Sequence, residues 1–419
     1  MTKRVVVVGS GVIGLCVALF CLRRGFAVTL LDRDSRERRS CSFGNAGRIV
    51  PSHFVPLAAP GAVRTGLKWM LDPTAPFHIR PRFSLDLLTW LIRFARAASR
   101  EHVERAAPLL RDLTLASRQC YEELAADPHA QFGLVKNGLL MVCSTAQAMR
   151  EEIESAEHAR RLGLAAEVYP GREVVAIEPG LRDDIAGAVH YPMDCHLSPD
   201  RLMAFLETEV ESAGGSLSWN THVVGWRSDA ANNRVVAAVT QDGREIVADE
   251  FVLCAGAWSP DAARDLGLAI PIQAGKGYTV TLPRFARTPS HCAILAEARV
   301  AVTPMNAGVR VGGTMELAGL TRAIDAARVR AVVDALSRYY TTMAPEDFAG
   351  IAPWSGLRPC SPDGLPYIGR TSRRRNVIVA AGHAMMGVTL APITGKIVAM
   401  LLCGEPPPFH MALLAPDRY

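Results

Sequence analysis

The N-terminal segment carries a glycine-rich turn between a strand pattern and a helix pattern, and this feature restricts the fold more than any other. Residues 4–9 form a β-branched run that is typical of a parallel strand buried on both faces. The glycines of residues 9–14 have GxGxxG spacing, and residues 11–24 have the apolar periodicity of a helix. Residues 27–31 predict a second strand, which leads into Asp32. Together these segments predict a βαβ unit of an α/β fold.

The three glycines and the acid have separate tasks in such a unit. Gly9 allows a tight turn, Gly11 lets the backbone approach a pyrophosphate, and Gly14 lets the helix pack close to the strand. The N-terminus of the helix offers free N–H groups to the phosphates. Asp32 lies 18 residues after Gly14, where its carboxylate can accept hydrogen bonds from ribose hydroxyls. The whole arrangement predicts dinucleotide binding.

The fingerprint alone does not separate FAD from NAD. Arg33 could read a 2′-phosphate, but the neighbouring Asp32 carboxylate would repel that phosphate, so the sequence disfavours NADP. The position of the unit favours FAD, because FAD proteins of this kind often begin with it and complete the lobe near the C-terminus.

Length and composition limit the class of protein. A chain of 419 residues exceeds one average domain, so two domains or two interleaved lobes are expected. The formal charge of +5 is small for this length and argues against a nucleic-acid-binding protein. The ten cysteines are scattered without CxxC spacing, and no His pair lies nearby at ligand spacing. We therefore predict no metal site, and reduced thiols in a cytoplasmic protein.

Two segments raise the question of a membrane. Residues 5–22 carry no charge and lie between basic pairs, as in a signal anchor, but their glycines favour strand, turn and helix. We expect no other stretch to be long enough to span a membrane, so the sequence predicts a soluble protein. Residues 58–123 look like a helical insertion, and its Trp69 and Trp90 admit a peripheral contact with the inner face of the cell membrane. Burial of both side chains in the core is the favoured interpretation.

The rest of the chain alternates between helix and strand patterns. Helices are predicted at residues 85–98, 109–124, 146–162, 199–213, 328–343 and 392–402. Strands are predicted at residues 138–143, 216–219, 235–240 and 251–254, with several more between residues 270 and 315. This order predicts a nucleotide-binding lobe assembled from separate segments, with a mixed α/β lobe inserted.

Motifs beyond the fingerprint resemble a known family. They are residues 42–47 (SFGNAG), 60–61 (PG), 68–70 (KWM), 72–81, 276–278 (KGY), 356–359 (GLRP), 363–369 (DGLPYIG) and 381–383 (AGH). In this order they are similar to those of bacterial FAD-dependent D-amino acid dehydrogenases, of the D-amino acid oxidase and glycine oxidase superfamily. D-Hydroxyproline dehydrogenases form a close subgroup, which the motifs leave open. The resemblance covers residues 5–402.

The resemblance implies a particular architecture. It is an α/β fold with an α+β substrate lobe, in which a Rossmann-like FAD-binding domain of discontinuous segments carries an inserted mixed-sheet substrate domain. We assign residues 1–57, 195–265 and 351–419 to the FAD-binding domain. The substrate domain then comprises residues 58–194, with the helical insertion, and residues 266–350.

The resemblance also implies the residues that bind FAD. Small residues in the loop at 42–47 let the backbone approach the flavin, although a plain surface turn is the alternative. The expected FAD-binding residues are Gly9, Gly11, Val12, Ile13, Gly14, Asp32, Arg33, Ser42, Asn45, Ala46, Gly47, Val224, Ala255, Gly256, Trp258, Gly382, Met386, Gly387, Val388 and Thr389. Related sarcosine oxidases attach flavin through a cysteine that aligns with Gly356, so non-covalent FAD is expected here.

Three side chains are candidates for the reaction. Arg358 occupies the position that clamps the substrate carboxylate in the superfamily, and a guanidinium can make two parallel charge-assisted bonds. Tyr278 resembles a residue on the substrate side of the flavin, and His383 could tune the flavin or line the pocket. A structural role is the alternative for each. The implied reaction is hydride transfer from the α-carbon to flavin N5, and the resulting imino acid hydrolyses to a 2-oxo acid.

Several alternatives stay open. The leading hypothesis is a D-amino acid dehydrogenase that passes electrons to an acceptor such as a quinone, with cyclic substrates such as D-proline or hydroxy-D-proline included. The others are an oxygen-using D-amino acid or glycine-type oxidase, a flavin-bearing subunit inactive outside a multi-subunit complex, and an NAD-linked dehydrogenase. Glycine oxidases have a second Arg where Met385 aligns, which puts glycine as substrate in doubt. A homo-oligomer is also among the open alternatives.

Overall fold

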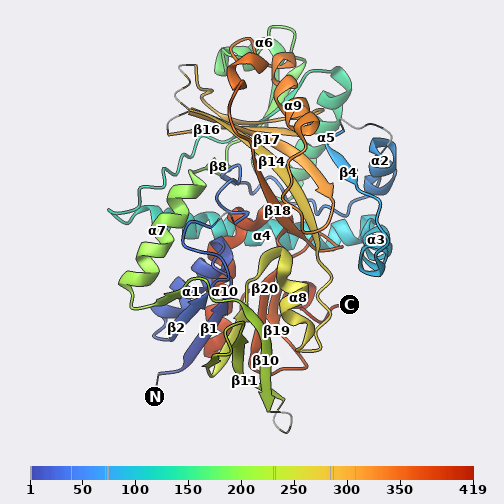
Figure 1. Cartoon of the computed structure of the whole chain (residues 1–419). Coiled ribbons are helices and arrows are strands. Elements are labelled where there is room, and N and C mark those ends of the chain that lie inside the picture. The colour runs from blue at the N-terminus through green and yellow to red at the C-terminus, as the bar shows by residue number, and fades with distance from the viewer. Residues whose placement is uncertain are drawn as a thin grey trace.

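The computed structural model describes residues 2–38, 40–70, 72, 75–229, 231, 233–283, 285, 287–306 and 308–419. Its strands form two large sheets, one in the lower and one in the upper half of Figure 1. Residues 73 and 74, which belong to the motif at 72–81, lie outside the described residues.

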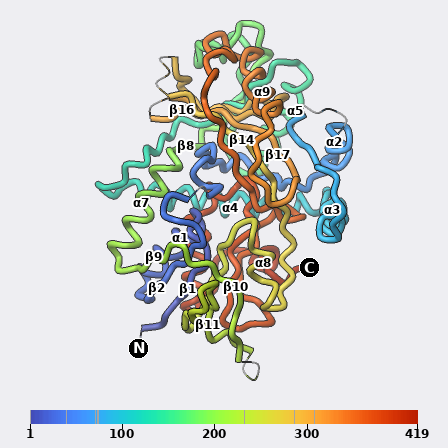
Figure 2. The backbone as a smooth tube through the Cα atoms, in the orientation of Figure 1, coloured from blue at the N-terminus to red at the C-terminus, as the bar shows by residue number. Residues whose placement is uncertain are grey.

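The lower sheet joins three distant parts of the chain, and its strand order is β19–β20–β13–β1–β2–β9. β1 pairs in parallel with both β2 and β13, and its four valines are buried, which explains the β-branched run. Its N-terminal, middle and C-terminal strands can be followed by colour in Figure 2. The strands are β1 (Arg4–Val8), β2 (Ala27–Leu31), β9 (Ser216–Ser218), β13 (Glu250–Leu253), β19 (Tyr367–Arg370) and β20 (Val377–Ala381).

Two apolar helices pack together at this sheet, α1 (Val12–Arg23) and α10 (Gly387–Cys403). A Cβ on Gly395 would lie 2.6 Å from the Cys16 carbonyl oxygen, so only glycine permits this close approach. On its other side α10 contacts α4 (Arg100–Ala125). The helical segment from Ala384 to Cys403 is long and apolar enough to cross a membrane, which corrects the expectation that only residues 5–22 reach that length. Most of it is buried, as in the core helix of a globular fold.

α10 starts five residues before the predicted start at Pro392. Proline has no N–H, so the carbonyl of Val388, four residues earlier, receives no bond from it. The hydroxyl of Tyr121, in α4, donates to this carbonyl at 2.6 Å. A buried side chain from a distant helix therefore satisfies the acceptor that the proline leaves free.

Tyr121→Phe is expected to lower the free energy of unfolding by about 1–3 kcal/mol, because it leaves the Val388 carbonyl buried without a donor. Urea denaturation with matched cofactor occupancy measures the change. Tyr169→Phe is the control, since the exposed Tyr169 hydroxyl bonds only to Glu167 and its loss should cost less than about 0.5 kcal/mol. Equal unfolding midpoints for the two variants would contradict this prediction.

The upper sheet has the order β18–β14–β17–β16–β15–β5–β7–β6, with β4 paired to β17. The strands are β4 (Phe77–Ile79), β5 (Leu139–Cys143), β6 (Glu167–Pro170), β7 (Gly187–Tyr191), β14 (Gln273–Pro283), β15 (Cys292–Leu295), β16 (Val300–Met305), β17 (Gly308–Leu317) and β18 (Trp354–Cys360). β18 belongs to this sheet although it lies in the 351–419 segment assigned to the FAD-binding domain. The domain boundaries stay a prediction.

The remaining elements cover the two sheets. Small sheets are formed by β10 (Val223–Asp229), β11 (Arg234–Thr240) and β12 (Glu245–Val247), and by β3 (Arg48–Ile49) and β8 (Cys195–His196). The helices are α2 (Ala62–Trp69), α3 (Leu85–Ala97), α5 (Ala146–Arg161), α6 (Gly171–Ile177), α7 (Pro199–Ser212), α8 (Ser259–Arg264) and α9 (Ala326–Asp334). α4 is longer than the predicted 109–124, and α9 ends well before residue 343. α2 and α3 lie at one side of the upper sheet (Figure 1).

Candidate functional site

A cavity of about 480 Å³ lies where β1 and β2 end and α1 begins. Gly9 has φ 105°, in the region that favours glycine, and a Cβ on Gly14 would collide with the Gly9 carbonyl oxygen. Gly11 differs, because its missing Cβ would face the cavity, with the Ser42 Oγ as the nearest atom at 3.6 Å. The turn therefore needs Gly9 and Gly14 for its own geometry, whereas Gly11 keeps the cavity open.

The Asp32 carboxylate is fixed at the wall of this cavity. Its Oδ2 accepts hydrogen bonds from the Ser10 N–H at 2.7 Å and from the Ser10 Oγ at 2.6 Å. Its Oδ1 accepts a bond from the Asp34 N–H at 2.9 Å. A carboxylate has about four acceptor positions, so one remains for a ligand hydroxyl.

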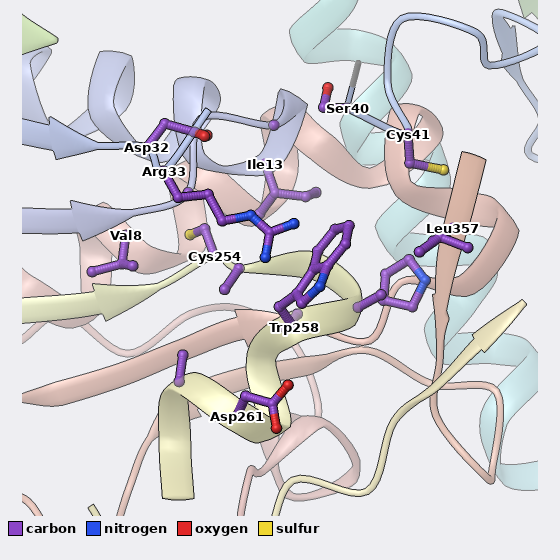
Figure 3. A pocket seen from close by; sticks show the side chains of 18 of the residues that line it. Val8, Ile13, Asp32, Arg33, Ser40, Cys41, Cys254, Trp258, Asp261 and Leu357 are labelled. Atoms are coloured by element: carbon purple, nitrogen blue, oxygen red, sulfur yellow. The ribbon is translucent and has the colours of Figure 1, made fainter. Parts of the chain in front are cut away.

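The side chains of Arg33 and Trp258 lie against each other in the lining of the cavity (Figure 3). The Arg33 guanidinium lies 3.9 Å from the centre of the Trp258 ring, which is cation–π geometry. Arg322, which sequence reasoning missed, lies 5.4 Å from the same ring. Val224, on β10, lines the same cavity and is half exposed, so it is not a core residue.

The loop at residues 42–47 connects the helix N-terminus to the upper sheet. The Ser42 Oγ accepts a hydrogen bond from the Val12 N–H at 3.0 Å. The Asn45 side-chain oxygen accepts one from the Gly47 N–H at 2.8 Å, and the Arg310 guanidinium donates to the Asn45 carbonyl. The Asn45 side-chain oxygen thus holds its own turn, while the residue also lines the first cavity.

His383 lines the same cavity and is almost completely buried. Its Nε2 lies 3.0 Å from the Thr394 Oγ1. Burial lowers the pKa of His383 to about 3, so the ring is neutral at physiological pH. A neutral imidazole of such low basicity suits a structural role and not that of a general base.

A second cavity, of about 890 Å³, lies between the upper sheet and helices α2 and α3. Aromatic side chains form much of its wall, namely Trp69, Phe77, Trp90, Phe94 and Trp354. Trp354 lies between Gly44 and Gly356, where any Cβ would collide with its indole ring. No Asp or Glu of the described residues lines this cavity.

Arg358 lines both cavities and is the charged residue that connects them. Its Nη1 donates to the Thr314 carbonyl at 2.6 Å. Thr314 has φ 67° and lies in a bulge of β17 opposite Gly277, where the guanidinium lies close enough to exclude a Cβ. No ion pair in the described part of the chain includes Arg358, so a structural acid does not neutralise it.

Tyr278 lines neither of these cavities, whereas the resemblance implied a place on the substrate side of the flavin. Its hydroxyl donates to the Glu316 Oε2 at 2.8 Å, and the Lys276 Nζ lies 3.1 Å from the same oxygen. Gly277 and Thr279, its neighbours on β14, line the second cavity instead. Alternation along the strand therefore turns Tyr278 into a buried ionic cluster on the opposite face.

The predicted residues divide among the two cavities. Those that line the first are Gly9, Gly11, Val12, Ile13, Asp32, Arg33, Ser42, Asn45, Val224, Ala255, Gly256, Trp258, Arg358, His383, Gly387 and Val388. Those that line the second are Asn45, Ala46, Arg358, Met386 and Thr389. Neither includes Gly14, Gly47, Tyr278 or Gly382. A Cβ on Gly47 would collide with the Leu197 carbonyl, and one on Gly382 would crowd the Tyr367 ring, so both glycines serve packing.

Sequence reasoning missed Arg48. This side chain lines the second cavity, and its Nε and Nη1 are buried without a hydrogen-bond partner. The available signal was an arginine directly before the apolar residues Ile49 and Val50, because a charge beside buried residues is costly unless it has a partner.

Comparison with known proteins decides the family. Residues 4–401 match the DAO family model, which is described as FAD dependent oxidoreductase. This chain belongs to the DAO family. Two relatives named D-amino acid dehydrogenase are 32% and 31% identical to it, from Paramagnetospirillum magneticum and Methylobacterium radiotolerans, and each alignment covers 99% of both chains. The resemblance stated from the motifs is thereby confirmed.

Solved structures of DAO enzymes share the fold. Glycine oxidase from Geobacillus kaustophilus superposes with a TM-score of 0.79 at 24% identity and covers 100% of both chains. Glycine oxidase from Bacillus cereus has a TM-score of 0.76 at 20% identity and covers 99% of this chain and 97% of its own. The predicted fold class is confirmed by these likenesses.

The DAO family uses FAD, and the first cavity fits this cofactor. The open side of Gly11 leaves room for a pyrophosphate before the N-terminus of α1, where the helix dipole favours an anion. Asp32 retains an acceptor position for a ribose hydroxyl. The predicted cofactor is confirmed.

Proposed function

We propose that this DAO enzyme oxidises the Cα–N bond of D-amino acids, with Arg358 as the group that binds the substrate carboxylate. The observation that carries the proposal is the position of the Arg358 guanidinium, which borders both cavities and has no carboxylate partner in the described chain. The Arg358 side chain is partly buried, and a bound carboxylate would supply the counter-ion that the described residues do not. The relatives named D-amino acid dehydrogenase favour the D hand.

The side chains of the site bind and orient more than they transfer protons. Arg358 would hold the carboxylate through its Nε and Nη2 edge, since Nη1 already donates to Thr314. FAD, when bound, would accept the α-hydrogen as hydride at N5. His383 has too little basicity to take the amine proton, so the substrate amine would lose it to water. The imino acid product would then hydrolyse to a 2-oxo acid, and a cyclic imine could persist.

The test is anaerobic mixing of the purified FAD-loaded protein with D- and L-amino acids, including D-proline and hydroxy-D-proline. Bleaching of the flavin absorbance by D-amino acids is expected, and its absence for every D-amino acid would refute the proposal. Activity of the isolated chain excludes the idea of a subunit that is silent alone. Peroxide release in air would favour an oxidase, whereas reduction of a quinone without peroxide would favour a dehydrogenase. Acid precipitation should release the FAD if it is non-covalent.

We further propose that helices α2 and α3 bind the surface of an anionic membrane. Exposed apolar side chains gather on and beside them, namely Leu67, Phe83, Leu85, Leu88 and Ile92. Residues 58–97 contain six Arg or Lys and two Asp, a net of +4 out of the formal +5 of the chain. Apolar side chains flanked by basic ones suit a bilayer of anionic lipid. Trp90 is not part of this surface, because it is buried and donates to the Cys360 carbonyl, as the core interpretation predicted.

Replacing Leu85 and Leu88 together by Glu is expected to lower binding to vesicles of mixed phosphatidylcholine and phosphatidylglycerol by at least about 10-fold. Co-sedimentation of the FAD-loaded protein measures the bound fraction. Val247→Glu, an exposed apolar position on β12, is the control and should change nothing. Wild-type protein that does not sediment with anionic vesicles would refute the membrane proposal.

A further inference from the structure

The second cavity contains a positive charge that the reaction does not use. Arg48, on β3, lines this cavity, and no ion pair of the described residues includes it. Its Nε and Nη1 are buried without a hydrogen-bond partner, so these donors lose their hydrogen bonds to water and gain none to the protein. Such a state is unfavourable unless a ligand supplies the missing acceptor.

No carboxylate of the described residues forms an ion pair with Arg48. Asp194 is close enough for its charge to act on Arg48. Its carboxylate, however, accepts hydrogen bonds from the Ser52 N–H and hydroxyl and not from Arg48. His53, at the same cavity, is neutral because burial and the adjacent arginines lower its pKa to about 3. The cavity wall therefore carries arginines and no acid among the described residues.

The charges at the second cavity indicate that its ligand carries more than one anionic group. Burial lowers the pKa of Arg48, and the charge of the nearby Arg358 lowers it further. An ordinary amino acid brings one carboxylate, which Arg358 would bind, and its ammonium group adds a further positive charge. The Arg48 donors would still have no acceptor. A substrate with an acidic side chain brings the second anion, and the roughly 890 Å³ of the cavity leaves room for it.

We propose that Arg48 binds a second acidic group of the substrate, so that the enzyme acts preferentially on D-amino acids with a carboxylate side chain. This inference rests on the proposed function, in which Arg358 binds the α-carboxylate. Arg48 is then a specificity-determining residue, because the carboxylate it binds takes no part in the oxidation.

The test compares kcat/KM for substrates of equal size and different charge, D-aspartate against D-asparagine and D-glutamate against D-glutamine. In at least one of these pairs, the wild-type FAD-loaded enzyme is expected to have a kcat/KM about 100-fold higher for the acid than for the amide. This ratio is the effect of one desolvated charge-assisted hydrogen bond. Arg48→Met should reduce that ratio to about one or less, and Arg48→Lys should keep part of it. Arg299→Met is the matched control, because Arg299 lines the same cavity but is exposed, and its variant should keep the ratio.

The outcomes separate this inference from the proposed function. Bleaching by neutral D-amino acids without preference for the acidic ones would overturn the inference alone, and no bleaching by any D-amino acid would overturn both. Equal losses for acidic and amide substrates in Arg48→Met would mean that Arg48 binds the α-carboxylate. If Arg48→Met does not fold, inhibition of the wild-type enzyme provides the test. Glutarate should then inhibit at least about 10-fold more strongly than butanoate, and equal inhibition would overturn the inference.

Discussion

Arg358→Met is expected to reduce kcat/KM for D-amino acids by about 10²-fold to 10⁴-fold, the largest effect of any single side chain at this site. The substitution removes a pair of charge-assisted hydrogen bonds to the substrate carboxylate, each worth about 1.5–3 kcal/mol. Arg358→Lys should recover only a small part of the loss, because an ammonium group has no planar fork to match the carboxylate. Anaerobic single-turnover reduction of the flavin, at a series of substrate concentrations, measures both the apparent substrate affinity and the limiting rate of flavin reduction.

The control for this experiment is the flavin content, since Arg358 also borders the first cavity. Rates are compared per bound FAD, and the visible spectrum shows whether the cofactor site is intact. An Arg358→Met enzyme that reduces its flavin as fast as the wild type, at the same substrate concentrations, would show that the carboxylate binds elsewhere.

Gly11→Leu is expected to abolish FAD binding, weakening it by more than about 10³-fold, while the chain still folds. The nearest protein atom to a Cβ at this position is 3.6 Å away, so the leucine projects into the first cavity and not into the core. The purified variant should be colourless, and added FAD should not raise its Tm. A yellow variant with one FAD per chain would exclude the pyrophosphate from this place.

Gly14→Ala provides the matched comparison. Its Cβ would collide with the Gly9 carbonyl oxygen inside the turn, so the damage falls on the fold itself and Tm should drop even without cofactor. Substitutions at two glycines of one motif thus have different effects: the one at Gly11 prevents FAD binding, and the one at Gly14 destabilises the turn.

Local patterns predicted the local elements of this fold. The β-branched run, the GxGxxG spacing and the second strand predicted β1, α1 and β2 within one or two residues, because a buried strand and a short helix each have a clear period. The start of α10 was predicted wrongly, because Pro392 is a common first helical residue. Its tolerance inside the helix depends on Tyr121, which lies 267 positions before the Val388 carbonyl that it bonds, and no local pattern contains that contact.

The site shows the same division. Arg358 was predicted from the GLRP motif, and the structure places it between the cavities. Tyr278 was misplaced although Lys276 and Tyr278 occupy alternate positions of one strand and must share a face, away from Gly277. Arg48 could not be judged from sequence, because its significance is the absence of a counter-ion, and that depends on which of 41 acids fold nearby.

The order of strands in the lower sheet has a consequence for synthesis on the ribosome. β1 emerges first, but its neighbour β13 ends at Leu253, and β13 pairs in turn with β20, which ends at Ala381. A nascent chain therefore leaves one edge of β1 unpaired until β13 has been made, and it leaves the face of α1 that packs on α10 uncovered until Cys403 has been made. Gly387 and Val388, which line the first cavity, belong to the same late segment, so the FAD site is complete only after they are made, and chaperone protection until then should raise the yield of active enzyme.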